Sequence, residues 1–403
     1  MALVAAAAIG LTACSGGGVL SSGGDVNTVD GALSSSIDDA IASAMQQSGS
    51  TEAVVGVWSA DGEYVTGYGD GIDGSARIRG AQATQPVMCA LLLDLVEEGR
   101  LDLDREITED LTRQSGVDGV TYRQLCDMTS GIRDFKGAYT DIFANNPSRP
   151  WPEQELIAQG LSDGPFRWRG LNMHQSDTNA VLLARVLKVE TATDISSLLR
   201  NRIFSPAGMG SSYYPDMSTT TVSGTTLNGL TYPSSGGAPV CDVEPVAVAE
   251  VSPSMLGGAG ATVTTVTDLK NFYTAYLDGA FGGEDASVVT TGIPTKNPDR
   301  DQDGNPTTEP DTAGRQWTFG MEKVGPLYGR TGSITGTLTA AYHDPESGYT
   351  VVVALNNSSA GAGFAKSLAF EIAAISAEAG SGPELAWTAE DQRGALAKAA
   401  VCQ

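Results

Sequence analysis

The stretch from Ile78 to Leu103 reads IRGAQATQPVMCALLLDLVEEGRLDL, and it decides the fold. Its second half is a leucine-rich run followed by glutamates, a pattern that is typical of a buried helix. Proline lacks a backbone N–H and is best tolerated in the first turn of a helix. Pro86 therefore predicts a helix that begins close to it, with Thr84 or Gln85 as the capping residue.

Five further segments place this helix in context, because each resembles a motif of one superfamily and they follow the same order. It is the superfamily of the serine β-lactamases and D-Ala-D-Ala carboxypeptidases, where an LVEEG-LDLD segment follows a Ser-x-x-Lys nucleophile motif. Together the segments cover roughly residues 50 to 378. They are 53–69 (AVVGVWSADGEYVTGYG), 121–132 (TYRQLCDMTSGI), 175–183 with 202–213, 257–273, and 328–356, which begins YGRTGSITG.

The resemblance implies an α+β fold of the β-lactamase/transpeptidase type. We expect an antiparallel sheet built from the hairpin at 53–69 and from the strands after about Trp317, flanked by helices. A mostly helical region at about residues 81–250 is expected to be inserted in this part. The whole domain is predicted to span residues 37–378 and to end in a helix over 364–377, where apolar residues recur at helical spacing.

The resemblance also assigns the catalytic motifs residue by residue. The Ser and Lys positions of the nucleophile motif hold Gln82 and Gln85, and the Tyr and Asn positions of the second motif hold Gln175 and Asp177. A carboxamide has no ionisable proton, so it can neither attack a carbonyl nor activate an attacker. The third motif reads RTG at 330–332 and keeps a cation, a hydroxyl and a glycine. A helix that starts near Pro86 would remove the backbone oxyanion donor as well.

Three hydroxyl side chains near the expected pocket are candidates for a substitute nucleophile: Thr84, Ser176 and Ser333. None has an evident base. The chain contains two histidines, of which His343 is predicted at a hairpin turn, while His174 precedes the second motif and faces either the cleft or a helix surface. The sequence therefore favours an inactive protein.

Three functions remain open at this point. The first is a catalytically inactive envelope protein that binds a peptide, such as a peptidoglycan stem peptide, or a protein partner; Arg330, Thr331, Gly332 and Ser333 would hold the ligand's carboxylate. The second is an active β-lactamase, D-Ala-D-Ala carboxypeptidase or esterase with an atypical nucleophile. The third is a scaffold lipoprotein that acts away from the cleft. An ion pair between Arg330 and Asp177 would close the pocket, and the three glutamines would suit a ligand rich in amides.

The composition and the N-terminal sequence limit the classes of partner that the protein can have. The chain has 403 residues, a formal net charge of −24 and no cluster of basic residues, which excludes nucleic acid. Docking on anionic lipid would need a covalent anchor. The apolar run of residues 1–13 ends in Leu-Thr-Ala-Cys14 and resembles a bacterial lipoprotein signal, although no Lys or Arg precedes it. We expect an acylated Cys14, a flexible Gly/Ser tether over 15–36, and export to the outer face of the bacterial cell membrane.

Four cysteines remain, and an even count in an exported protein favours two disulfides over free buried thiols. The resemblance implies a Cys89–Cys126 bridge, since the helices that carry these residues pack together in the family. Cys241 and Cys402 are expected to form the second bridge and to pin a C-terminal tail, residues 379–403, that otherwise reads as loosely attached.

An acidic insertion, NPDRDQDGN from Asn297, resembles part of a calcium-binding loop. Asp299, Asp301 and Asp303 alternate before a glycine, as the first ligands of an EF-hand do. The twelfth position, which should be a bidentate Glu, is Pro310. Both a structural calcium site and a solvated acidic loop are therefore open, and no other cofactor is expected.

Overall fold

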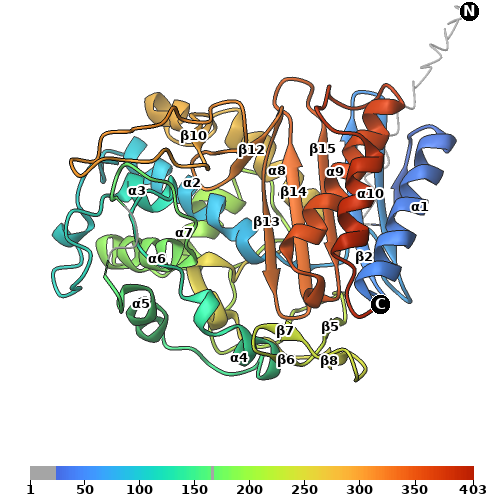
Figure 1. The fold of residues 1–403 in the computed structure, drawn as a ribbon, viewed down its shortest axis with the longest axis horizontal. Helices are drawn as coiled ribbons and strands as arrows, with labels where there is room; N and C mark the ends of the chain where they lie inside the picture. Colours follow the sequence, from blue (N-terminus) through green and yellow to red (C-terminus); the bar gives the residue numbers. More distant parts are fainter. Residues whose placement is uncertain (1–23, 165–167) are drawn as a thin grey trace, which may run out of the picture.

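The computed structural model describes residues 24–164 and 168–403. Its centre is a nine-stranded antiparallel sheet with helices on both faces (Figure 1). The inner strands are buried along their whole length, because both faces are covered. In sheet order the strands are β1 (Val26–Asn27), β3 (Gly62–Tyr68), β2 (Ala53–Ser59), β15 (Thr350–Leu355), β14 (Thr337–His343), β13 (Leu327–Ile334), β12 (Glu322–Val324), β11 (Gln316–Trp317) and β10 (Ile293–Pro294).

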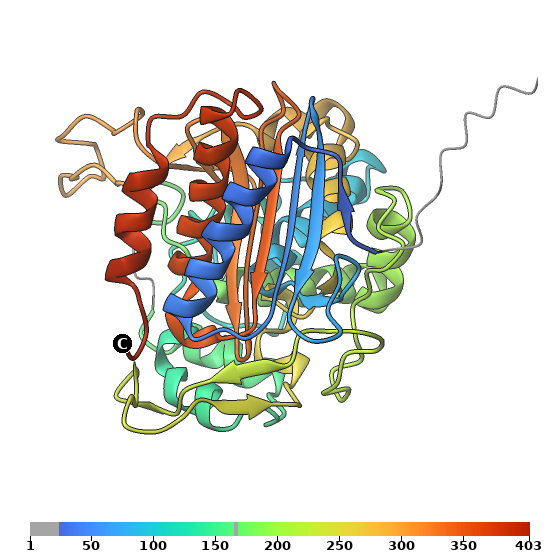
Figure 2. The same cartoon turned by 90° about the vertical axis from the view of Figure 1, so that its right-hand side faces the viewer.

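Three helices cover the outer face of the sheet: α1 (Gly31–Ser48), α9 (Ala362–Glu378) and α10 (Ala389–Lys398) (Figure 2). In α1 the apolar residues recur at helical spacing and Ile37 and Ile41 are fully buried. They belong to one hydrophobic cluster with the outward-facing residues of the central strands and the inner face of α9. The predicted C-terminal helix over 364–377 corresponds to α9.

One predicted boundary is wrong, and the C-terminal tail is held by more than the disulfide that was expected to pin it. The segment 15–36 is not a tether throughout, because β1 pairs with β3 and α1 begins at Gly31 with Asp30 as its N-cap. The C-terminal tail is not loose, because α10 packs on α9 with Leu396 buried, and the N–H of Val401 donates to the carbonyl of Gln47. Burial of apolar residues fixes both segments. Cys14 and the lipoprotein-like signal lie outside the described residues.

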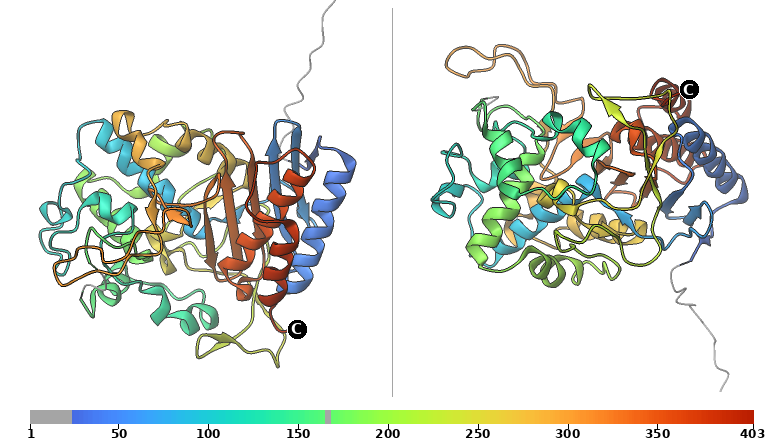
Figure 3. Two further views of the ribbon diagram at one scale, coloured as in Figure 1. Left: turned by 45° about the horizontal axis from the view of Figure 1, so that its top comes forward. Right: turned by 90° about the horizontal axis from the view of Figure 1, so that it is seen from below.

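The mostly helical region lies on the other side of the sheet (Figures 1 and 3). Its core is α2, whose residues from Thr84 to Leu93 are all buried, so this stretch of the helix is covered on every side. Two-stranded ribbons border the region at β4 (Ile78–Arg79) with β9 (Val263–Thr264), β5 (Gly229–Thr231) with β8 (Val246–Val248), and β6 (Ser234–Ser235) with β7 (Ala238–Pro239). The helices are α2 (Thr84–Glu97), α3 (Tyr122–Cys126), α4 (Thr140–Asn145), α5 (Glu153–Leu161), α6 (Asp177–Thr191), α7 (Ile195–Leu199) and α8 (Val266–Leu277).

Both disulfides have the pairing that the sequence predicts. Cys89–Cys126 joins α2 to α3, and Cys241–Cys402 joins the segment before β8 to the C-terminus. No helix in the described part of the chain is long and apolar enough to cross a membrane.

Candidate functional site

The catalytic motifs of the family meet where the head of α2 lies against β13. A 3-10 turn, Ala81–Ala83, runs directly into α2, so the helical path begins earlier than Pro86 predicts. Neither Thr84 nor Gln85 is the cap: both are helical, and Pro86 is the third residue of α2, where its missing N–H has no intrahelical partner to lose. Gln82 consequently keeps the first-turn backbone position that a helix starting near Pro86 would have lost.

The backbone before Gln82 is strained. Ala81 has φ +46°, a left-handed conformation that costs energy for a residue with a Cβ and that persists only when its surroundings enforce it. Gly332 on β13 is part of that enforcement, since a Cβ there would lie 2.5 Å from the nitrogen of Gln82 and 2.7 Å from the Cβ of Ala81. The strained turn therefore lies directly before Gln82 and is held there by its close contact with β13.

Three of the altered positions, Gln82, Gln85 and Asp177, form one buried hydrogen-bond network with Arg330 of the third motif. Asp177 accepts from both glutamines, Oδ2 from Gln82 Nε2 at 2.6 Å and Oδ1 from Gln85 Nε2 at 2.7 Å. Gln85 Oε1 in turn accepts from Nε and Nη2 of Arg330 at 3.1 and 3.0 Å. All four side chains are at most 4% exposed. The direct ion pair between Arg330 and Asp177, one of the alternatives that the sequence left open, does not form; the amide of Gln85 lies between the two charges and hydrogen-bonds to both.

Gln82 also takes the backbone donor of the third motif. Its Oε1 accepts from the N–H of Ser333 at 2.8 Å. The side-chain carbonyl of Gln82 thus occupies a backbone donor of β13. Gln82 stands at the position compared with the nucleophile of the enzymes. None of the four side chains has a buried nitrogen or oxygen atom without a hydrogen-bond partner, as is usual for buried polar groups.

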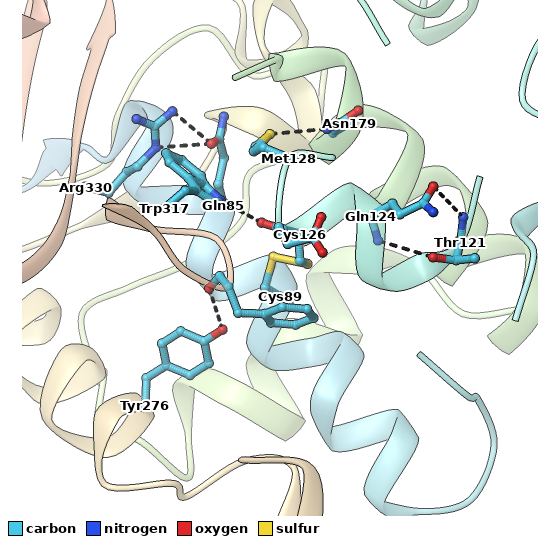
Figure 4. Close-up of a disulfide and its surroundings, with 12 residues drawn as sticks. Gln85, Cys89, Thr121, Gln124, Cys126, Met128, Asn179, Tyr276, Trp317 and Arg330 are labelled. Carbon is cyan, nitrogen blue, oxygen red and sulfur yellow. Dashed lines mark hydrogen bonds between the residues drawn. A yellow bond between two sulfur atoms is a disulfide. The ribbon is translucent and has the colours of Figure 1, made fainter. Parts of the chain in front are cut away.

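Arg330 has two further contacts. Its guanidinium carbon lies 4.8 Å from the centre of the Trp317 ring. The amide of Gln175, which is exposed, accepts from Nη2 at 2.7 Å when its oxygen faces the guanidinium. Trp317 is fixed in turn by a bond from its Nε1 to the carbonyl of Cys126 at 2.9 Å, next to the disulfide with Cys89 (Figure 4).

The candidate substitute nucleophiles are bound to the backbone or lack a base. The Thr84 hydroxyl accepts from the N–H of Thr262, and the Ser176 hydroxyl donates to the carbonyl of Arg133. Ser333 is partly exposed, and Lys136 Nζ donates to its carbonyl oxygen, not its hydroxyl.

The histidine predictions need one correction. His343 is not in a turn: it is the last residue of β14, 3% exposed, with Nδ1 2.8 Å from the Thr350 hydroxyl. Burial lowers the pKa of its imidazole. The turn that was expected at His343 begins one residue later, at Asp344. His174 is half-buried, and its backbone N–H donates to the carbonyl of Met128.

Two residues at the site went unrecognised in the sequence: Asp134 and Lys136, directly after the TSGI motif at 129–132. Asp134 Oδ1 accepts from the backbone N–H groups of Asp177 (3.2 Å) and Lys136 (3.1 Å). Burial, together with the charge of Asp177, raises the pKa of Asp134 to about 7. Their position after a recognised motif was the signal that could have identified them.

A second charged group borders the site. Glu322, 3% exposed, accepts from Lys366 at 3.2 Å, from Arg315 at 3.3 Å and from the hydroxyl of Tyr342. Burial alone would raise the pKa of Glu322, but Lys366, Tyr342 and Arg315 hold it below its usual range. Two cations therefore share one carboxylate at this end of the site.

These side chains line a cavity of about 260 Å³. Its walls carry four cations, Lys136, Arg315, Arg330 and Lys366, and three carboxylates. A second hollow of about 240 Å³ lies along the end of β13, and Lys136 borders both. The site can recognise charge, but it contains no nucleophile in any of the positions that the family uses.

The calcium-like loop docks beside this site. Asn297 binds both the N–H and the carbonyl of Met173, and Arg300 donates to Asn172. Asp301 accepts from the backbone N–H of Asp303, an Asx-type turn. In residues 24–164 and 168–403 no three acidic, His or Cys side chains converge as a metal site would require, so Asp299, Asp301 and Asp303 do not form a preassembled cage.

The fold and the site together define a penicillin-binding-protein-like α+β protein whose nucleophile positions hold amides. The β-lactamase family model matches residues 37–374, and the chain belongs to this family. Solved structures agree. A D-stereospecific amidohydrolase from a Streptomyces species superposes with a TM-score of 0.69 at 22% identity, over 81% of this chain and 94% of that one.

Two further structures share the fold. The D-amino acid amidase from Ochrobactrum anthropi SV3, complexed with D-phenylalanine, gives a TM-score of 0.65 at 22% identity, over 85% of this chain and 99% of that one. The octameric penicillin-binding protein homologue from Pyrococcus abyssi gives 0.67 at 19% identity, over 87% and 78%. At these identities the likeness establishes a common architecture.

Proposed function

We propose that this protein is a catalytically inactive member of its family that binds a peptide by its terminal carboxylate in the cavity beside β13. The observation that carries the first half of the proposal is the position of Gln82. Its carboxamide stands where a nucleophile would, and it already accepts the Ser333 N–H. A group without an ionisable proton cannot form an acyl intermediate there.

The charge of the cavity supports the second half. The chain carries 24 basic and 48 acidic residues, yet four of the basic ones converge on this one cavity against three carboxylates. Arg330 is buried and already engaged, so we assign it, with Thr331 and Gly332, to the wall that supports the ligand. Lys366 and Arg315 keep 23% and 46% of their side chains exposed and remain able to meet an anion.

A peptidoglycan stem peptide fits this description, because it ends in a carboxylate. Its remaining residues would lie along the second hollow, past Lys136 and Ser333. With Cys14 acylated, the protein would act at the outer face of the bacterial membrane, where such peptides are exposed.

Acylation tests the inactive state. Full-length protein is incubated with a fluorescent penicillin and with an activated ester, and its intact mass is measured. We expect no acyl adduct on the unmodified chain. The double variant Gln82→Ser/Gln85→Lys is measured alongside it to test whether the rest of the cleft still accepts a substrate. An acyl adduct on the unmodified chain would overturn the inactive assignment in favour of an atypical hydrolase, and peptide mapping would locate its nucleophile.

Binding tests the ligand class. A peptide ending in D-Ala-D-Ala is titrated by calorimetry against the same peptide with a C-terminal amide. We expect the free acid to bind more tightly, and Lys366→Gln to reduce that preference, while Lys398→Gln on the exposed face of α10 should have no effect. Equal binding of acid and amide would refute carboxylate recognition; binding of neither would leave the scaffold role, away from the cleft, as the better assignment.

A further inference from the structure

A further cavity, separate from the cleft and from the hollow beside it, lies in the helical region and has a volume of about 480 Å³. It is enclosed by α5, α6, the start of α7 and the segment 214–217. This volume is within the range of pockets that hold small organic molecules. None of its lining residues belongs to the network of Gln82, Gln85, Asp177 and Arg330.

The interior of this cavity is apolar and firmly built. Trp151, Leu156 and Val181 form its buried walls, each at most 3% exposed. Its floor is the Gly257–Gly258 turn, and Gly258 lies so close to α6 that a Cβ there would be 2.4 Å from the carbonyl oxygen of Ala180. The space is therefore set by backbone packing, and a ligand would find it preformed.

One buried polar atom of the wall lacks a partner. Trp151 is 3% exposed, and within residues 24–164 and 168–403 its Nε1–H donates to nothing. Its backbone N–H is satisfied by the hydroxyl of Ser254. Buried indole N–H groups usually have an acceptor, so the missing one points to an acceptor on a bound molecule.

The rim of the cavity is negative. Glu153 is neutralised by Arg185 at 2.6 Å and Lys188 at 3.4 Å. Asp194 and Asp216, both exposed, form no ion pair with any described residue. Asp194 accepts instead from the backbone N–H of Ser197, and Asp216 accepts from the hydroxyl and the backbone N–H of Ser218. These hydrogen bonds hold the pKa of both carboxyls below the usual range.

We infer that this cavity binds a small organic amine that has an apolar body and a hydrogen-bond acceptor. The apolar body occupies the space between Trp151, Leu156 and Val181. The acceptor takes the indole N–H of Trp151, and the ammonium group lies at the rim between Asp194 and Asp216. The apolar body matches the apolar walls, the acceptor matches the unpartnered indole N–H, and the ammonium group matches the two unpaired carboxylates.

Three related probes separate these contributions. N-(2-aminoethyl)benzamide has a ring, a carbonyl and an ammonium group; N-ethylbenzamide lacks the charge; hippurate replaces it with a carboxylate. We expect calorimetric or NMR titration of the full-length protein to give a Kd of about 1 mM for the amine, the order of magnitude for a ligand of a dozen heavy atoms. The neutral probe should bind about threefold to tenfold more weakly, and hippurate more weakly still.

Variants locate the binding. Asp194→Asn and Asp216→Asn remove the charges but keep the same turn bonds, since Asn caps as well as Asp. Together they should abolish the preference for the amine, whereas Asp61→Asn, in the distant β2–β3 turn, should leave it intact. Ser196→Trp at the rim should block all three probes.

The inference fails if hippurate binds as tightly as the amine, if the paired Asn variants leave the preference unchanged, or if the amine shows no binding at about 10 mM. Because the Asn variants preserve the local hydrogen bonds, the test does not depend on whether Ser196→Trp folds. Loss of peptide binding at the cleft would not affect this result, so the two proposals can fail independently.

Discussion

Replacing Gln85 by leucine should destabilise the protein far more than a Gln-to-Leu change normally does. Leucine conserves the volume but removes three hydrogen bonds: one to Asp177 and two from Arg330. Arg330 and Asp177 would then stay buried without the hydrogen bonds that Gln85 provides. Each buried group that loses its partner costs about 1–3 kcal/mol, so we expect a loss of about 4 kcal/mol in the free energy of unfolding.

Thermal and urea unfolding measure this loss. With an unfolding entropy of about 2.1 cal/mol/K per residue and about 380 residues in the described part of the chain, 4 kcal/mol corresponds to a fall in Tm of about 5 °C. Gln46→Leu on the exposed side of α1 is the matched control and should change Tm by less than about 1 °C. A loss below about 1 kcal/mol for Gln85→Leu would refute the reasoning, because it would mean that Arg330 and Asp177 pair directly once the amide is gone.

Three other perturbations test the same region. The pKa of Asp134 is raised from 3.8 to about 7, so the contribution of this carboxyl to stability is complete below about pH 4 and is lost as the pH rises through 7. Asp134→Asn should therefore flatten the dependence of the free energy of unfolding on pH between these values. A pH dependence parallel to that of the unmodified protein would contradict this assignment. Replacing Cys89 and Cys126 by alanine opens a loop of 37 residues and should cost about 4 kcal/mol in urea unfolding, with a loss under about 1 kcal/mol as the contrary result. Gly332→Ala places a Cβ 2.5 Å from the nitrogen of Gln82 and should lower Tm by several degrees, whereas an unchanged Tm would show that β13 can shift.

Sequence reasoning located most elements whose motifs are contiguous. The hairpin at 53–69 became β2 and β3, and the predicted C-terminal helix is α9. It missed α1, because Gly and Ser residues around 31–36 read as a linker although Leu33, Ile37 and Ile41 already had helical spacing. It missed α10 for a similar reason, since that helix is mostly polar and is held by packing on α9.

The start of α2 shows the limit of local rules. Pro86 is compatible with several positions in a first turn, and only the contact of Ala81 and Gln82 with β13 extends the helical path back to residue 81. Tertiary packing decided the boundary here because it stabilises a strained φ that no local preference favours.

The family fold could be read from the sequence alone, and so could the carboxamides of Gln82 and Gln85 at the positions compared with the nucleophile motif. A carboxamide has no ionisable proton in any environment, so this part of the chemistry needs no structure. The contacts that these amides make follow from the packing of the elements. Gln85 meets Arg330 across 245 residues of chain and Asp177 across 92, and it separates two charges whose pairing the sequence had left open. The reason is geometric: these partners come from different elements, and their distances are set by how α2, α6 and β13 pack together.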